Sequence, residues 1–177
     1  MQFNQTQIPD VILIKNQIHK DERGFFNEFY HKDIFYDNGI SDSFIQSNHS
    51  RSIKNTLRGL HYQNKHPQSK LVKCIRGEIL DIAVDIRPES IYFGKWVGQK
   101  LSGTNGLQLY IPVGFAHGFL VLSDTADVIY QCNEKYYPED NCGIIWNDPT
   151  LNIDWGIKKP ILSIRDQKLP FLLDLNN

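Results

Sequence analysis

The sequence has few cysteines, no long apolar run and almost no net charge. Its three cysteines, Cys74, Cys132 and Cys142, are odd in number and form no Cys-x-x-Cys pair, which disfavours a disulfide framework and a thiolate zinc site. No apolar run approaches the roughly 20 residues that span a bilayer. The 19 basic and 20 acidic side chains are scattered and leave a formal net charge of −1, so the basic stripe that nucleic acids and anionic membranes require is absent.

The N-terminal segment also lacks the basic region and apolar core that mark a secretory signal. These absences predict a cytoplasmic protein with neither a nucleic-acid partner nor a membrane partner. The chain has 177 residues, 41% of them hydrophobic, and a domain of this length buries roughly 70% of the surface that its unfolded chain exposes. No repeat or linker divides the sequence, so we predict one domain over residues 1–177.

What the sequence does contain is a series of short segments rich in Val, Ile, Phe and Tyr, separated by Gly, Asn, Asp and Pro. Their spacing of about ten residues is typical of an all-β barrel or sandwich. Strands are predicted at 11–14, 25–30, 44–50, 56–63, 70–75, 78–86, 97–101, 108–111, 119–122 and 128–132. The helical signal is weak, with a short helix at 31–36 and a capping spacing from Ser163 to Asp166.

The clearest predicted strand is 78–86, where apolar residues alternate with Asp81, Ala83 and Asp85. Two-residue alternation predicts one buried face and one charged, exposed face. Arg76–Gly77, directly before it, is typical of the turn of a β-hairpin.

Six histidines are the natural candidates for chemistry near neutral pH. His19, His31 and His66 lie in polar segments and are predicted to be solvated surface residues. His49 ends an apolar strand, where a ligand contact at a barrel mouth is a weaker alternative. His61 and His117 differ from these because each belongs to a motif.

His117 ends the spacing Gly-x5-Pro-x-Gly-x2-His, which resembles a motif of the cupin superfamily of small jelly-roll β-barrels. In metal-binding cupins an earlier motif supplies His-x-His and a Glu, ligands suited to iron, manganese or zinc. The corresponding segment here is His61-Tyr62-Gln63, so the metal set is incomplete and we predict no metal.

A histidine without a metal can act as a general base when a carboxylate orients its other ring nitrogen. Asp81, Asp85 and Asp166 are candidates for that carboxylate, and the residues alone do not choose between them. Removal of a proton from carbon also requires a group that holds the resulting oxyanion. Lys70 is a candidate, on a strand that we expect beside that of His61.

Ten segments in order resemble the dTDP-4-dehydrorhamnose 3,5-epimerases, metal-free cupins of sugar-nucleotide biosynthesis. They are 21–28, 44–50, 57–63, 70–72, 77–87, 111–118, 130–132, 136–138, 146–148 and 162–166. The resemblance implies a cupin-type jelly-roll β-barrel with a few short helices and no cofactor. It also implies a nucleotide-sugar substrate and a homodimer in which an N-terminal strand crosses to the partner sheet.

The implied reaction inverts C3 and C5 of dTDP-4-dehydro-6-deoxy-D-glucose to give dTDP-4-dehydro-L-rhamnose. The resemblance makes His61 the base, Asp166 its dyad partner, Tyr130 the acid on the opposite face and Lys70 the group that holds the enolate oxygen. Matched substrate contacts are Arg23, Glu28, Gln46, Asn48, Arg58 and His117, with the arginines suited to bidentate pyrophosphate contacts. Arg165 stands where many members carry Lys, and Asn141 about where many carry Glu. Tyr137 is a further candidate, for stacking on the nucleotide base.

Strict alternation would place Arg58 and His61 on opposite faces of one strand, although the resemblance requires both to reach one ligand. Gly59 between them therefore predicts a β-bulge that resets the alternation.

Three alternatives to this function stay open on the sequence. The first is an epimerase acting at one carbon, or a keto-isomerase acting on a related nucleotide 4-keto-deoxysugar. The second is a sugar-nucleotide binding module without catalysis. The third is a metal-dependent cupin oxygenase.

Overall fold

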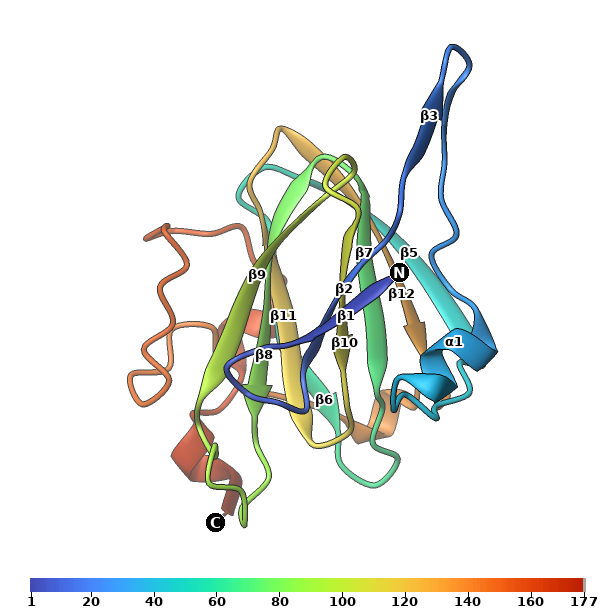
Figure 1. The fold of residues 1–177 in the computed structure, drawn as a ribbon. Coiled ribbons are helices and arrows are strands. Elements are labelled where there is room, and N and C mark those ends of the chain that lie inside the picture. Colours follow the sequence, from blue (N-terminus) through green and yellow to red (C-terminus); the bar gives the residue numbers. More distant parts are fainter. Residues whose placement is uncertain (177) are drawn as a thin grey trace.

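Two antiparallel sheets packed face to face form the body of the protein, in a computed structural model that describes residues 1–176 (Figure 1). The strands are β1 (Gln2–Gln5), β2 (Ile12–Lys15), β3 (His19–Asp21), β4 (Gly24–Phe26), β5 (Gln46–Ile53), β6 (Leu57–Gln63), β7 (Lys70–Arg76), β8 (Glu78–Asp85), β9 (Trp96–Ser102), β10 (Leu107–Ile111), β11 (Phe115–Val121), β12 (Thr125–Cys132) and β13 (Asn141–Gly143). Helix α1 (Lys32–Asp37) and three short 3-10 helices, η1 (Pro138–Asp140), η2 (Asp166–Lys168) and η3 (Leu172–Asn176), complete the described chain.

The six-stranded sheet has the order β1-β2-β10-β7-β12-β5, and the five-stranded sheet has the order β13-β6-β11-β8-β9. Buried aliphatic and aromatic residues of both sheets meet between them, among them Val72 of β7, Leu109 of β10 and Phe119 of β11. This architecture confirms the predicted all-β barrel with few short helices. Each of the ten predicted strands overlaps an observed strand, and the predicted helix at 31–36 is found as α1.

The prediction that β8 exposes one charged face is wrong. Asp81 and Asp85 on that face are 0% exposed, because they point between the two sheets. The opposite face of β8 is also buried, since Ile82 and Val84 pack under residues of the C-terminal segment such as Trp155. When both faces of a strand are covered, its apolar and polar side chains still alternate, but the alternation no longer distinguishes a buried face from an exposed one.

The predicted hairpin at Arg76–Gly77 is also wrong, because β7 and β8 lie in different sheets. The residues form a corner at which the chain passes from one sheet to the other. Gly77 has a φ of +77°, and a Cβ there would overlap the backbone carbonyl of Thr125, so the corner requires glycine. A hairpin turn and such a corner share the same local sequence signal.

Three strands escaped sequence prediction because they carry little apolar signal. β1 is mostly polar, β3 is exposed along its length, and β13 has three residues. β3 and β4 form a separate two-stranded hairpin that extends away from the barrel (Figure 1). No helix within residues 1–176 is long and apolar enough to cross a membrane.

Candidate active site

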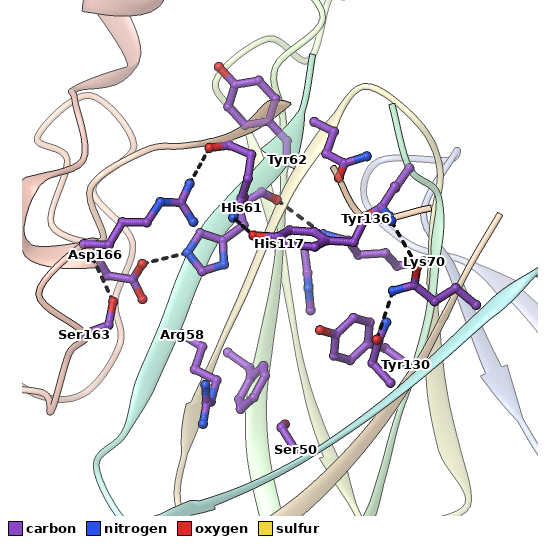
Figure 2. A pocket seen from close by; sticks show the side chains of 17 residues that line it. Ser50, Arg58, His61, Tyr62, Lys70, His117, Tyr130, Tyr136, Ser163 and Asp166 are labelled. Carbon is purple, nitrogen blue, oxygen red and sulfur yellow. Dashed lines mark hydrogen bonds and ion pairs between the residues drawn. The ribbon is translucent and has the colours of Figure 1, made fainter. Parts of the chain in front are cut away.

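A pocket of about 390 Å³ opens between the two sheets (Figure 2). Strands of both sheets and the segment around η2 contribute its walls. It is lined by Gln46, Asn48, Ser50, Arg58, His61, Tyr62, Gln63, Gln68, Lys70, His117, Phe119, Tyr130, Tyr136, Asn141, Ser163, Arg165 and Asp166. All four predicted catalytic residues and six of the nine predicted substrate contacts therefore face one cavity.

Arg58 and His61 both line this pocket because β6 carries a bulge. His61 lies opposite His117 and Arg58 lies opposite Phe119, so three steps along β6 match two steps along β11. The extra residue resets the alternation, as predicted at Gly59. Gly59 has a φ of +113°, and a Cβ there would lie 2.6 Å from the carbonyl oxygen of His117.

We expect Gly59→Ala to lower the free energy of unfolding by about 3 kcal/mol, because the added Cβ meets rigid backbone as well as an unfavourable φ. Gly39→Ala is the matched control, since Gly39 also has a positive φ but open space around it. The control is expected to cost about 1 kcal/mol. Urea unfolding of the two variants measures the difference, and equal losses would contradict this role of Gly59.

His61 is paired with Asp166, which settles the choice among the three candidate carboxylates. His61 Nε2 donates to Asp166 Oδ1 at 2.7 Å, as the dashed line in Figure 2 shows. The backbone N–H of Asp166 donates to Ser163 Oγ at 3.0 Å, which is the contact that the predicted capping spacing requires, although Arg165 rather than Ser163 is the N-cap of η2. Burial raises the pKa of Asp166, but the hydrogen bond and the charge of His61 outweigh it, so this pKa lies below its usual value.

Lys70 and Tyr130 lie on the wall opposite His61. Both belong to the six-stranded sheet, on β7 and β12, whereas His61 belongs to β6 of the five-stranded sheet. The expectation that Lys70 lies on the strand adjacent to His61 is therefore wrong. Lys70 faces it across the barrel and donates from Nζ to the carbonyl oxygen of His61 at 3.4 Å.

Burial in this second wall shifts the pKa values of both Tyr130 and Lys70. Burial raises the pKa of Tyr130, and this effect exceeds the opposing influence of Arg58, so the phenol keeps its proton near neutral pH. Burial lowers the pKa of Lys70, and Cys132 and then Asp81 oppose this effect. The pocket thus places an imidazole on one wall and a protonated phenol on the other.

Six predicted substrate contacts lie around these groups: Gln46, Asn48, Arg58, His117, Asn141 and Arg165. Arg165 donates to the carbonyl oxygen of Asn141, and Asn141 donates from Nδ2 to the phenol oxygen of Tyr136 at 2.9 Å. The two positions at which this chain departs from the family pattern therefore contact each other at the pocket.

Three predicted substrate contacts are not in this pocket. Arg23 and Glu28 lie in and just after the projecting hairpin, and the Arg23 side chain is 85% exposed beside Asp21. Tyr137 stacks on His66 with ring centroids 4.0 Å apart, so its ring is already occupied within the protein. His49, the weaker histidine candidate, pairs with Asp127 outside the pocket.

Tyr136 lines the pocket, whereas the sequence analysis named its neighbour Tyr137. Its side chain is 51% exposed and reaches the pocket, as Figure 2 shows. The Tyr-Tyr-Pro motif contains both residues, and nothing local distinguishes them. Ser50, Tyr62, Gln63, Gln68, Phe119 and Ser163 were also missed; Tyr62 and Gln63 adjoin His61 in its motif.

Within residues 1–176, no group of three or more His, Cys, Asp or Glu side chains is arranged to hold a metal ion. The two histidines of the pocket are each directed at one aspartate. His117 Nε2 contacts Asp81 Oδ1 at 2.7 Å, which matches the geometry of His61 and Asp166.

A two-sheet β-barrel with a His–Asp pair facing a Tyr and a buried Lys has the fold and site of an acid–base enzyme. The particular family follows from comparison with known proteins. The sequence model of dTDP-4-dehydrorhamnose 3,5-epimerase matches residues 5–174, and the chain belongs to this epimerase family. A relative of that name from Escherichia coli (strain K12) is 50% identical over 177 residues, covering 98% of this chain and 95% of the relative.

Solved structures show the same likeness. The dTDP-6-deoxy-D-glucose-3,5-epimerase RmlC from Legionella pneumophila, in complex with dTDP-4-keto-L-rhamnose, is 46% identical with a TM-score of 0.96, covering 99% of this chain and 94% of that one. ChmJ, a 3'-monoepimerase from Streptomyces bikiniensis in complex with dTDP-quinovose, is 31% identical with a TM-score of 0.89, covering 96% and 87%. The family resemblance and the cupin-type jelly-roll fold are thereby confirmed. Because the chain belongs to an epimerase family, a binding module without catalysis and a metal-dependent oxygenase are no longer favoured as functions.

Proposed function

We propose that this enzyme inverts C3 and C5 of dTDP-4-dehydro-6-deoxy-D-glucose and yields dTDP-4-dehydro-L-rhamnose. The observation that carries the proposal is the placement of His61 and Tyr130 on opposite walls of one pocket. Inversion at carbon requires a base on one face of the sugar ring and an acid on the other. Both carbons flank the C4 ketone, so one pair of groups can serve each in turn.

In this mechanism His61 removes the proton from the carbon beside the ketone, and the electron pair moves to the ketone oxygen. Asp166 stabilises the imidazolium that forms. The Lys70 ammonium holds the enolate oxygen, and its buried setting strengthens that interaction. Tyr130 then donates its proton to the opposite face of the carbon. Proton exchange with solvent restores His61 and Tyr130 for the second inversion.

The remaining pocket residues would hold the nucleotide. Arg58 and Arg165 are suited to the two phosphates, since each guanidinium offers paired donors. Tyr136 replaces Tyr137 as the aromatic side chain proposed to stack on the base. Gln46, Asn48 and His117 supply polar contacts to the sugar.

Arg23 and Glu28 enter this proposal through a second copy of the chain. They lie on and beside the projecting hairpin, whose Phe25 and Phe26 are 62% and 69% exposed, so the hairpin is free to meet a partner. We expect a solution mass twice the 20.5 kDa of one chain. Light scattering after size-exclusion chromatography measures it, and a monomer at working concentration would remove both residues from the site.

The single domain over residues 1–177 and the cytoplasmic location remain parts of the proposal. Limited proteolysis tests the first, since one domain should give no stable fragment that retains part of the barrel. Fractionation of cells that express the chain tests the second.

Identification of the product tests the proposed function. The purified enzyme is incubated with dTDP-4-dehydro-6-deoxy-D-glucose, and the configuration at C3 and C5 is read from proton couplings in the NMR spectrum. Inversion at both carbons is expected. Inversion at one carbon would favour the second candidate, a single-carbon epimerase, which the likeness to the 3'-monoepimerase ChmJ supports. Unchanged substrate would contradict both.

A further inference from the structure

Asp81 is a buried carboxylate that uses only part of its capacity to accept hydrogen bonds. It points from β8 into the space between the sheets and is 0% exposed. Oδ1 accepts from His117 Nε2 at 2.7 Å, whereas Oδ2 has no hydrogen-bond partner among residues 1–176. A buried carboxylate oxygen without a donor is costly, so a positive or donating group is expected to act on it.

Lys70 has the opposite imbalance. Its ammonium is buried between the sheets and donates one long hydrogen bond, to the carbonyl oxygen of His61 at 3.4 Å. An ammonium carries three N–H donors, and a buried one requires a compensating negative charge. The barrel interior thus contains an unpaired acceptor on Asp81 and unpaired donors on Lys70.

The other ionisable groups around the pocket do not supply that charge. They are His61, Arg58 and Tyr62 on β6, His117 on β11, Tyr130 on β12, Tyr136 before η1, and Arg165 and Asp166 at η2. Cys132 on β12 is the cross-strand neighbour of Lys70. Burial raises the pKa values of Cys132 and Tyr130, so both keep their protons near neutral pH. Asp166 is already hydrogen-bonded to His61. Cys132 and then Asp81 oppose the effect of burial on the pKa of Lys70, and of these two only Asp81 is a carboxylate.

We propose that Asp81 is the counter-ion that keeps Lys70 protonated and directed into the pocket, and that His117 anchors Asp81 in place. Among residues 1–176 neither a hydrogen bond nor an ion pair joins Asp81 Oδ2 to the Lys70 ammonium, so the interaction runs through one water molecule. Asp81 contacts no substrate atom in this account and is a positioning residue. Its catalytic consequence rests on the proposed role of Lys70 at the enolate.

The sign of the pH effect follows from this arrangement. Lys70 must be protonated to hold an enolate, and Asp81 raises the pKa of Lys70. Removal of the carboxylate charge therefore lowers the pH at which Lys70 loses its proton. In Asp81→Asn the alkaline limb of kcat is expected to move to lower pH, with a smaller change in KM.

Lysine NMR tests the inference without turnover, so its failure is distinguishable from failure of the proposed function. The protein is labelled with ¹³C at lysine Cε, and Lys70→Arg identifies the Lys70 signal. In Asp81→Asn the Lys70 titration is expected to move down by about one pH unit or more. Asp81→Glu, which keeps the charge, is expected to restore most of the wild-type value.

Asp85→Asn is the matched control, because Asp85 is equally buried on β8 but pairs with Arg87 outside the pocket. It is expected to leave the Lys70 titration unchanged. Asp81→Ser, which removes the charge and leaves room for water, replaces the Asn variant if that variant does not fold. A Lys70 titration that is the same in wild type and in the folded charge-removing variant would overturn the proposal.

Discussion

His61→Gln is expected to lower kcat about 10³-fold or more, with little change in stability. Glutamine lacks a basic nitrogen, so the general-base contribution is lost. Its amide Nε2 lies near the position of imidazole Nε2 and can still donate to Asp166, which otherwise would be a buried carboxylate without its partner. The loss in kcat therefore reports chemistry rather than a damaged fold. Steady-state kinetics with the 4-keto sugar nucleotide measures it.

His49→Gln is the matched control for this prediction. His49 also pairs with a buried aspartate, at 2.9 Å from Asp127, but it lies outside the pocket. Its replacement is expected to leave kcat within about twofold of wild type. Equal losses in the two variants, or a His61 variant that keeps a tenth of the activity, would remove His61 from the role of base.

Lys70→Met is expected to lower kcat by about 10² to 10³-fold, the range typical for loss of one group that stabilises an oxyanion. Methionine has a similar length and suits a buried site, so the barrel is expected to remain folded. KM is expected to change less than kcat, because the interaction with the oxygen strengthens as the enolate forms.

Lys73→Met provides the control, since Lys73 lies on the same strand and its ammonium sits over the ring of Phe29 at 4.6 Å, away from the pocket. Its kcat is expected to stay near that of wild type. Circular dichroism and thermal unfolding of both variants separate loss of fold from loss of activity. A Lys70 variant with wild-type kcat would show that the enolate is held by another group.

Sequence reasoning succeeded where the physical signal is local. The strand pattern predicted the all-β class. The bulge at Gly59, which the register of β6 and β11 contains, needed the family resemblance as well, because only the resemblance required Arg58 and His61 to reach one ligand. β11 was predicted too short, because His117 and Gly118 interrupt its apolar pattern although all seven of its residues are buried.

The failures arose where the answer depends on which sheet a strand joins. Lys70 was expected beside His61 and instead faces it across the barrel. Asp81 was expected at the surface and instead lies in the interior, hydrogen-bonded to His117. Pairing between strands distant in sequence decides both positions, and alternation within one strand carries no information about it.

The choice of a carboxylate for His61 illustrates the same limit within the site. Asp81 and Asp85 occur in a well-patterned strand, whereas Asp166 lies in an irregular segment more than 100 positions from His61. In the structure Asp166 nevertheless forms a hydrogen bond with the imidazole of His61, and Asp81 forms one with His117. The residues alone left the three carboxylates equal. The resemblance to the family selected Asp166, and the structure shows the hydrogen bond between Asp166 and His61.

The central claim, that His61 and Tyr130 work from opposite faces, is tested most directly by turnover in deuterated water. Wild type and Tyr130→Phe are compared for deuterium at C3 and C5 and for the configuration of the product. Wild type is expected to give label at both carbons with inversion, whereas the variant should exchange protons through His61 and return the original configuration. Inversion at the wild-type rate in the variant, or no label at either carbon in wild type, would contradict the mechanism.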